Sequence, residues 1–352
     1  MPEKVRLGFI GCGFMGQCVH LPSFKKVKNA EIIAISDLRP KLAKAVAERW
    51  KIRKVYPSHL EMIEDKEIDA IVEITNKFLH TRIAVDALKA GKHVFTEKPI
   101  ATTSKDALEM VRAAEKKDLK LMVGYMKRYD TGVLKAKEAY EEFISHDKVT
   151  WARSHIFGGG RASDTPAEQM ITTDEKNPEI EPRYPDFLPK NLTTVMNDLL
   201  EVLVHYINLP RYFLGDPAAV DSFKFWPSGS MAVLNYGDYP LITEFFRISS
   251  DFWDEQTQLY FKDGWIKMRP PPLLMRNMAA KVDIYRAGET QRDEFPHGSA
   301  SYGFEREAQH FIDCIVDDKE PISSGADSYK DIVIIESMLK ALIENKRIEI
   351  EF

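Results

Sequence analysis

The segment LGFIGCGFMGQ constrains the fold more than any other part of the chain, because it places Gly11, Gly13 and Gly16 in GxGxxG spacing. These glycines directly follow an apolar run that predicts a strand, and they open a segment that predicts a helix. In such a turn the first glycine permits a tight bend, the second lets a pyrophosphate approach the backbone, and the third lets helix and strand pack closely. The start of the helix, at Phe14 and Met15, then offers N–H groups and a positive dipole end to phosphates.

The first part of the chain alternates short β-rich runs with amphipathic helical stretches, which is typical of βαβ units in a parallel sheet. The predicted strands cover 5–10, 31–36, 70–75, 93–96 and 119–125. Helices are predicted between them, among others over 40–50 and 81–90. We therefore expect residues 1–126 to form an NAD(P)-binding domain of the Rossmann type, with a doubly wound parallel sheet.

The later part of the chain has period-2 alternation without intervening helices, which favours a mostly antiparallel sheet. These strands are predicted over 149–157, 220–226, 241–249, 256–261 and 281–286, with helical stretches at 192–214 and 302–316. We expect residues 127–352 to form an α/β domain for substrate binding and oligomerisation. One face of its sheet is expected to be open to a partner subunit, which suggests a homodimer or homotetramer.

Residues 158–190 differ from both parts, because they contain five prolines and little apolar periodicity. This composition predicts a long loop. Loops of this length inside compact domains are usually functional lids or disordered linkers. A lid and a plain insertion therefore both remain open.

Composition excludes several classes of function. The chain has 352 residues, room for about two domains, and its 49 basic and 54 acidic residues give a net charge of -5. This balance offers no footprint for nucleic acid. The chain has no apolar run long enough to span a membrane and no signal-peptide pattern at its start. Three scattered cysteines do not make a disulfide framework, so we expect a cytoplasmic protein.

A carboxylate follows the second predicted strand, at Asp37, 21 residues after Gly16. A carboxylate at this place accepts hydrogen bonds from the adenosine ribose and repels a 2′-phosphate, which favours NAD over NADP. Capping of the next helix is the alternative role for Asp37. Arg39 points the other way, because an arginine near this position can accommodate a 2′-phosphate.

Polar residues also follow two further predicted strands, where ligands bind in open α/β sheets. Thr75, Asn76 and His80 lie in VEITNKFLH, and Glu97 and Lys98 lie in HVFTEKPIA. A lysine that is partly desolvated beside a nicotinamide has a lowered pKa, which makes it a usable proton donor or acceptor. The alternative is that Lys98 only pairs with Glu97 at the surface.

The predicted helix over 192–214 carries a second group of polar side chains, Glu201, His205 and Asn208, spaced to project from one face. A carboxylate beside an imidazole orients it and raises its pKa. A helical histidine taken alone is more often structural. Glu201 and His205 are also possible zinc ligands, but the sequence offers no third ligand nearby, so we expect no metal.

In their order and spacing, GxGxxG, Asp37, the TNxxxH segment and EKP resemble the Gfo/Idh/MocA family of oxidoreductases, which includes glucose-fructose oxidoreductase and inositol dehydrogenase. The resemblance continues through VGYMKRYD and HYINLPRYFLGD, and is weakest over 158–190 and in the later strands. It implies NAD(P)-dependent hydride transfer between nicotinamide and a secondary alcohol of a sugar, an inositol or a sugar derivative.

The resemblance also assigns roles to individual residues. It implies that Lys98 is the catalytic lysine and that His205 shares the proton transfer. Asn76, His80 and Glu97 are implied to lie around the nicotinamide ribose, and Arg128 is implied to lie near the substrate together with Glu201 and Asn208. Family members often have aspartates where this chain has Glu201 and Asn208, which leaves open whether His205 is the principal base or a substrate-positioning group.

Two other functions remain open at this point. In the first, the protein retains NAD through the cycle and uses transient oxidation to drive elimination or glycoside cleavage. In the second, the protein is a nucleotide-sensing regulator without catalysis. The presence of Glu97, Lys98 and His205 argues against the regulator, because a sensor needs no proton-transfer pair.

Overall fold

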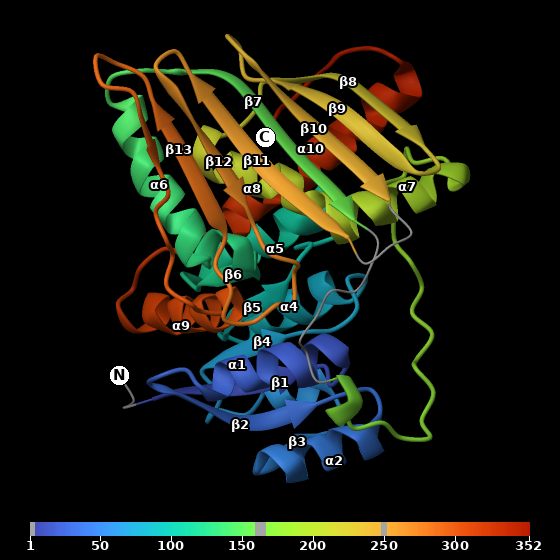
Figure 1. Cartoon of the computed structure of the whole chain (residues 1–352). Helices are drawn as coiled ribbons and strands as arrows, with labels where there is room; N and C mark the ends of the chain where they lie inside the picture. The colour runs from blue at the N-terminus through green and yellow to red at the C-terminus, as the bar shows by residue number, and fades with distance from the viewer. Residues whose placement is uncertain (1–3, 159–166, 248–251) are drawn as a thin grey trace. The chain divides into compact units, whose positions relative to one another are not determined.

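The structure is a computed structural model that describes residues 4–158, 167–247 and 252–352 (Figure 1). The described residues divide into two compact units, and each unit combines segments that are far apart in the sequence. The first unit contains 4–125, 167–185 and 304–332, and the second contains 126–158, 186–247, 252–303 and 333–352. The sequence predicts a single domain over 127–352, whereas 167–185 and 304–332 belong to the first unit.

The first unit is built on a six-stranded parallel sheet with the order β3-β2-β1-β4-β5-β6. The strands are β1 (Val5–Ile10), β2 (Ala30–Ser36), β3 (Lys54–Tyr56), β4 (Ala70–Glu73), β5 (His93–Glu97) and β6 (Leu121–Gly124). The strand order reverses between β1 and β4, so the doubly wound sheet is confirmed. Ligands bind at such a switch point, beyond the carboxyl ends of the strands.

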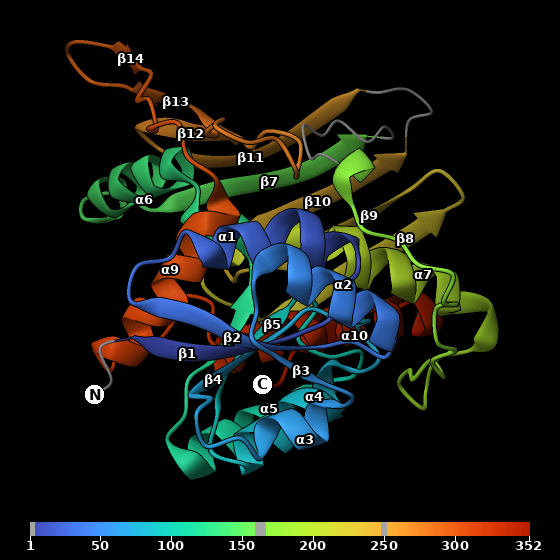
Figure 2. The ribbon, with the colours of Figure 1, turned by 90° about the horizontal axis from the view of Figure 1, so that it is seen from below.

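Helices cover both faces of this sheet; Figure 2 shows α1 and α2 on one side and α3, α4 and α5 on the other. Their bounds are α1 (Leu21–Lys25), α2 (Pro40–Trp50), α3 (His59–Ile63), α4 (His80–Lys89) and α5 (Ser104–Lys117). A π-helical turn, η1 (Gly16–His20), precedes α1. The later helix α9 (Gly303–Val316) adds Phe304 and Phe311, whose rings pack against His20 and Phe95.

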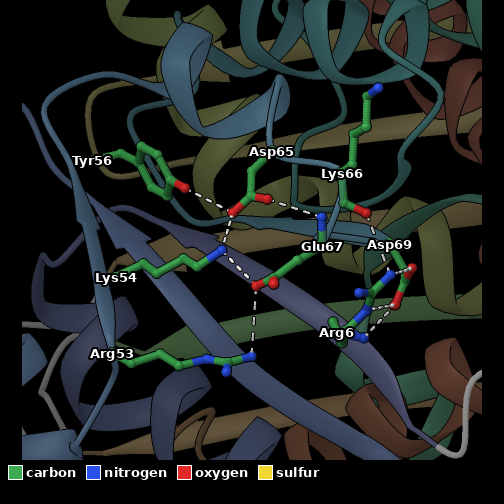
Figure 3. Close-up of polar contacts among 8 residues, drawn as sticks. All are labelled: Arg6, Arg53, Lys54, Tyr56, Asp65, Lys66, Glu67 and Asp69. Atoms are coloured by element: carbon green, nitrogen blue, oxygen red, sulfur yellow. Dashed lines mark hydrogen bonds and ion pairs between the residues drawn. The ribbon is translucent and has the colours of Figure 1, made fainter.

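An ionic network ties the amino ends of the strands together (Figure 3). Lys54, at the start of β3, lies 2.6 Å from both Asp65 and Glu67, and Arg6 of β1 binds both carboxyl oxygens of Asp69, which precedes β4. The ammonium of Lys54 holds the pKa of Asp65 well below its usual range. Ion pairs therefore link the amino ends of these strands, and ligands bind at the opposite, carboxyl ends in such sheets.

The second unit is built on a nine-stranded sheet with the order β14-β13-β12-β11-β7-β10-β9-β8-β15. Its strands are β7 (Val149–Gly158), β8 (Ala219–Trp226), β9 (Gly229–Asn235), β10 (Pro240–Arg247), β11 (Trp253–Phe261), β12 (Gly264–Arg269), β13 (Lys281–Arg286), β14 (Arg292–Glu294) and β15 (Ile348–Glu349). Among the described strands of this sheet, β7 and β10 pair in parallel and the other pairs are antiparallel, so the mostly antiparallel sheet is confirmed. Residues 248–249 of one predicted strand lie outside the described residues.

Two helices pack on one face of this sheet, α6 (Thr131–Ile144) and α8 (Val204–Leu214) (Figures 1 and 2). The chain also forms η2 (Met126–Tyr129), η4 (Lys190–Leu192), α7 (Thr193–Asp198) and η5 (Leu199–Leu203), and α10 (Gly325–Glu344) has residues in both units. No helix within the described ranges is long and apolar enough to cross a membrane.

The alternation along the strands separates the two faces of the nine-stranded sheet. On β7, Ala152 and Ile156 are buried, whereas Trp151 points to the other face and is 42% exposed. That face carries an open hollow of about 600 Å³, lined by Trp151, Arg153, Met231, Ile242, Glu244, Gln258 and Tyr260. One face of the sheet is therefore apolar and covered, and the other displays aromatic and charged side chains.

The predicted long loop over 158–190 falls into two parts. Residues 159–166 lie outside the described residues. Apart from the short 3-10 turn η3 (Ala167–Gln169), residues 167–185 contain no helix or strand, and they pack on the first unit. The side chain of Gln17 bonds both the N–H and the carbonyl of Ile171, and the Thr102 hydroxyl donates to the carbonyl of Arg183.

Candidate functional site

The glycine turn after β1 leaves no room for a side chain at Gly11 and Gly16 but has open space at Gly13. Gly11 has a φ of +101°, and a Cβ there would lie 2.1 Å from the carbonyl oxygen of Ile74. A Cβ on Gly16 would lie 2.2 Å from the carbonyl oxygen of Gly11, whereas a Cβ on Gly13 would meet nothing within 4 Å. The open side at Gly13 is the space that a pyrophosphate needs to approach the backbone.

The start of the helix lies beside this opening. Phe14 is 37% exposed and Met15 is half-buried. The Gln17 side chain donates to the carbonyl of Cys12 at 2.8 Å and so fixes the turn from behind. The backbone of the turn is therefore held in shape by contacts that leave its outer side accessible.

Asp37 lies at the carboxyl end of β2 and contacts the same turn. Its Oδ2 accepts a hydrogen bond of 2.6 Å from the N–H of Cys12. Its Oδ1 accepts from the N–H and the Nε of Arg39, at 2.9 and 2.8 Å. The structure thus brings Asp37 and Arg39 together as an ion pair beside the glycine turn, where the ribose of a dinucleotide binds in Rossmann folds.

The Glu97 carboxylate fixes the backbone of Lys98. Its Oε2 accepts from the N–H of Lys98 at 2.8 Å, and its Oε1 accepts from Nε2 of His20 at 2.7 Å. Burial alone raises the pKa of Glu97, but the bond from His20 and the charge of Lys98 outweigh it and hold the pKa below its usual range. The anionic Glu97 therefore anchors the half-buried Lys98 at the end of β5; the Lys98–Pro99 bond that follows is cis.

His80 and Glu73 support the same turn from α4 and β4. His80 is buried; its Nδ1 lies 2.8 Å from the carbonyl oxygen of Pro99, and its Nε2 lies 3.8 Å from Oε2 of Glu73. Glu73 also accepts bonds from the N–H of Thr75 and the hydroxyl of Thr96. Glu73 is not among the residues predicted from the sequence, although a carboxylate at the end of the apolar strand AIVE is a signal for it.

The parallel pairing of β1, β4 and β5 puts these groups at one edge of the sheet. The glycine turn follows β1, Thr75 and Asn76 follow β4, and Lys98 follows β5. Asn76 is exposed, and its side-chain oxygen accepts from the N–H of Phe78 at 3.1 Å. Contacts of Asn76, His80 and the others with a cofactor stay predictions.

Glu307 of α9 is a buried acid that the sequence analysis did not identify. It is fully buried, and neither of its carboxyl oxygens has a hydrogen-bond partner among the described residues. Burial and the nearby charge of Glu97 raise its pKa well above the ordinary glutamate value. Glu307 is therefore protonated at pH values where an exposed glutamate is charged.

This raised pKa predicts a pH-dependent stability. The folded chain keeps a proton on Glu307 that the unfolded chain loses, so the contribution of Glu307 is lost as the pH rises through its folded-state pKa. We expect the melting temperature of the natural chain to fall relative to that of Glu307→Gln, by a few degrees, as the pH rises from the ordinary glutamate pKa of 4.5 toward the neutral range. A difference in melting temperature that stays constant over this range contradicts the assignment.

In the second unit, the predicted substrate residues Arg128 and Asn208 contact each other. Arg128 is 2% exposed; its Nε donates to Oδ1 of Asn208 at 2.8 Å, and its Nη2 donates to the Asn208 carbonyl at 3.2 Å. This contact fixes the guanidinium against α8, the helix that carries His205. A contact of either residue with substrate stays a prediction.

His205 lies on α8 and is 2% exposed, whereas Glu201 lies in η5 and is exposed. The sequence predicts one regular helix with Glu201, His205 and Asn208 on one face. Instead, the π-helical turn η5 interrupts it, and a π-turn changes the angular spacing between Glu201 and His205. The spacing of a regular helix therefore does not describe this pair.

Lys127 of η2, the residue before Arg128, forms a buried ion pair with Glu255 of β11. The Lys127 ammonium is in direct contact with a Glu255 carboxyl oxygen, and both side chains are less than a tenth exposed. Burial lowers the pKa of Lys127 and raises that of Glu255, and each charge opposes the shift of the other. No local sequence pattern predicts this pairing, because the partners are 128 residues apart.

The candidate residues thus fall into two groups. Lys98 and the glycine turn belong to the first unit, and His205, Arg128 and Asn208 belong to the second. Within the described parts of the chain, no group of three or more His, Cys, Asp or Glu side chains is arranged to hold a metal ion.

Comparison with known proteins assigns the family. Residues 5–125 match the family model GFO_IDH_MocA, described as "Oxidoreductase family, NAD-binding Rossmann fold". The chain is 30% identical over 330 residues to the inositol 2-dehydrogenase/D-chiro-inositol 3-dehydrogenase of Lacticaseibacillus casei, which covers 82% of this chain and 93% of that protein. The chain belongs to the Gfo/Idh/MocA oxidoreductase family. The resemblance found in the sequence is confirmed, and the first unit contains an NAD-binding Rossmann fold.

Two further relatives extend this result. Myo-inositol 2-dehydrogenase of Thermotoga maritima is 34% identical over 137 residues, which span 39% of this chain and 41% of that protein. A solved levoglucosan dehydrogenase, in complex with NADH and L-sorbose, is similar over 99% of both chains with a TM-score of 0.80 and 19% identity. At that identity the structural likeness shows the shared fold over the full length.

Proposed function

We propose that this chain is an NAD-dependent dehydrogenase that acts on a secondary alcohol of an inositol, a sugar or a sugar derivative. The observation that carries the proposal is the placement of Lys98. The Glu97 carboxylate anchors its backbone at the carboxyl end of β5, on the same sheet edge as the glycine turn. A lysine in this position is suited to move a proton while a hydride is transferred.

The first unit fits NAD by its own geometry. The open side of the turn at Gly13 leaves room for a pyrophosphate, and the Asp37 carboxylate lies beside that turn. In this proposal the pyrophosphate is held by Gly11, Gly13, Phe14, Met15 and Gly16. The adenosine ribose lies at Asp37 and Arg39. The nicotinamide ribose is surrounded by Thr75, Asn76, His80 and Glu97. NAD, when bound, supplies the hydride acceptor.

The proton is handled by the chain's own residues. Lys98 accepts the hydroxyl proton of the substrate as the adjacent C–H bond breaks, and returns it when a ketone is reduced. His205 shares this proton transfer, and Arg128, Glu201 and Asn208 recognise the substrate. The buried contact between Arg128 and Asn208 supports this role, because it gives both polar groups a fixed orientation.

The substrate class is supported by the named relatives. The similar proteins of L. casei and T. maritima are named for inositol, and the structural neighbour is named for levoglucosan. Family members often have aspartates where this chain has Glu201, in η5, and Asn208, on α8, so the proposed substrate contacts of the second unit differ from the common ones. We therefore propose the class of inositols, sugars and sugar derivatives as substrates.

The test is NADH formation, followed by absorbance, with purified chain, NAD or NADP, and a panel of inositols, aldoses, uronic acids and glycosides. NADH formed with one substrate class supports the proposal. Cleaved or dehydrated product without NADH replaces it with the mechanism that retains NAD. Binding of NAD with no turnover across the panel favours the nucleotide-sensing regulator.

We also propose that the chain forms a homodimer or homotetramer through the exposed face of the nine-stranded sheet. The hollow is lined by Trp151, Arg153, Met231 and Tyr260 among others, and aromatic residues, methionine and arginine are enriched at subunit interfaces. Light scattering is expected to give the mass of a dimer or tetramer, and Trp151→Glu is expected to shift it toward the monomer. A natural chain that scatters as a monomer contradicts this part of the proposal.

The three buried cysteines form no disulfide, which fits a cytoplasmic location.

A further inference from the structure

The helix α2 is capped by a residue from a distant part of the chain. Its own N-cap residue, Arg39, makes no capping bond with its side chain. The Glu175 carboxylate takes this role instead: Oε1 accepts from the N–H of Lys41 at 3.0 Å, and Oε2 accepts from the N–H of Leu42 at 2.9 Å. The hydroxyl of Thr173 donates to the same carboxylate at 3.0 Å. The amino end of α2 therefore already holds an anion.

The cationic side chains at this place are also bound. Nε and Nη2 of Arg39 bond to Asp37, and its Nη1 donates to Oδ1 of Asn177 at 2.8 Å. The ammonium of Lys41 lies 2.8 Å from Asp174. Residues 174–177 thus supply an acceptor to each donor group that follows β2. Asn177 accepts from the Arg39 guanidinium, Asp174 pairs with the Lys41 ammonium, and Glu175 accepts from the helix N–H groups.

These donors are the ones that a 2′-phosphate would require. An NADP-binding Rossmann fold accommodates the 2′-phosphate beside the end of the second strand, with an arginine nearby, and helix N-termini attract phosphates by their N–H groups and dipole. Here the Asp37 carboxylate lies where the adenosine ribose would bind, and Glu175 places a second negative charge on the N–H groups of Lys41 and Leu42. A phosphate would have to displace Glu175 or lie against it.

We propose that Glu175 is a specificity-determining residue for the cofactor: its carboxylate occupies the amino end of α2 and thereby excludes the 2′-phosphate of NADP. This inference rests on the proposed use of NAD. It gives the loop 167–185 a role beyond that of a plain insertion, and it assigns discrimination to a residue outside the βαβ units.

Glu175 contributes more to this discrimination than its neighbour Asp174. The Asp174 and Lys41 side chains are 76% and 64% exposed, so solvent and salt screen that pair. Glu175 is half-buried and accepts from three donors. Partial desolvation raises the pKa of Glu175, but the backbone bonds from Lys41 and Leu42 hold it below its usual range, so the carboxylate is charged at neutral pH.

The experiment measures the binding of two nucleotide fragments to the full chain by calorimetry. The probes are 5′-AMP, which matches the adenosine half of NAD, and 2′,5′-ADP, which adds the 2′-phosphate. In Glu175→Gln the shape is kept and the charge is removed. We expect its affinity for 2′,5′-ADP to rise about fivefold to tenfold, with little change for 5′-AMP. Glu175→Ala is expected to shift the ratio in the same direction.

Glu179→Gln is the matched control, because Glu179 is exposed in the same segment and carries the same charge. We expect it to leave the ratio of the two affinities unchanged. A loop that only docks on α2 predicts that Glu175→Gln changes both affinities equally, and this result overturns the inference. A natural chain that binds 5′-AMP while all variants keep its ratio also overturns it and leaves the proposed function standing. Binding of neither fragment to the natural chain contradicts the proposed function and the inference together.

Discussion

Replacing Lys98 with alanine is expected to lower the rate constant of NADH formation about a hundredfold to ten-thousandfold, the usual contribution of a positioned acid or base. The physical reason is the loss of the group that accepts the hydroxyl proton as the hydride leaves. The Glu97 carboxylate holds the backbone N–H of residue 98, which alanine retains, so the turn itself should keep its shape. NAD binding, measured by fluorescence or calorimetry, is expected to change little.

The control for this variant is Lys89→Ala, which removes an exposed lysine from α4 in the same unit. It is expected to leave both the rate constant and NAD binding as in the natural chain. If Lys98→Ala keeps more than about a tenth of the activity, proton transfer by Lys98 is not required and the proposed role is wrong.

Replacing Glu255 with methionine is expected to destabilise the second unit by about 3–5 kcal/mol, because it leaves the Lys127 ammonium buried without its counter-ion. Lys127 and Glu255 are 7% and 3% exposed, so water cannot replace the lost partner. Denaturant unfolding followed by fluorescence measures the change. The effect should be larger than that of breaking exposed pairs such as Lys148 with Asp238, whose loss costs at most about 1 kcal/mol.

The double variant Lys127→Met with Glu255→Met separates the cost of a stranded charge from the cost of altered packing. Removal of both charges is expected to recover most of the stability lost in the single variant, because two apolar side chains of similar size need no desolvation. A double variant that is less stable than the single one would show that the ion pair itself holds η2 against β11, and would contradict this explanation.

Local patterns predicted much of the fold. The strand over 5–10 and the helix over 40–50 have the predicted bounds, because their apolar residues recur with the period of one element and their ends carry turn residues. The glycine turn was also predictable from its spacing. The structure gives the physical reason, because Gly11 and Gly16 have backbone neighbours that leave no room for a Cβ. Strand β3 has three residues and no apolar alternation, and its pattern gave no signal.

Long-range contacts account for what the sequence did not predict. Glu307 is 210 residues from Glu97, yet their charges act on each other in the first unit, and Glu175 caps a helix more than 130 residues earlier in the chain. Lys127 and Glu255 pair across a similar separation. A local pattern records the period of one element, and it contains no information about which distant segment packs against that element. The π-helical turn η5 was not predicted either, because no sequence signal marks the change that it makes in the spacing of Glu201 and His205.

In the proposed reaction a hydride passes between the alcohol carbon of a polyol or sugar and NAD. The most direct measurement uses a substrate that carries deuterium on the carbon bearing the oxidised hydroxyl, with NAD and the full chain, followed by mass spectrometry of the cofactor. One deuterium is expected in each NADH released, and Lys98→Ala is expected to form the same labelled NADH only at its low residual rate. Product that forms while the released cofactor stays oxidised and unlabelled would contradict the proposed reaction.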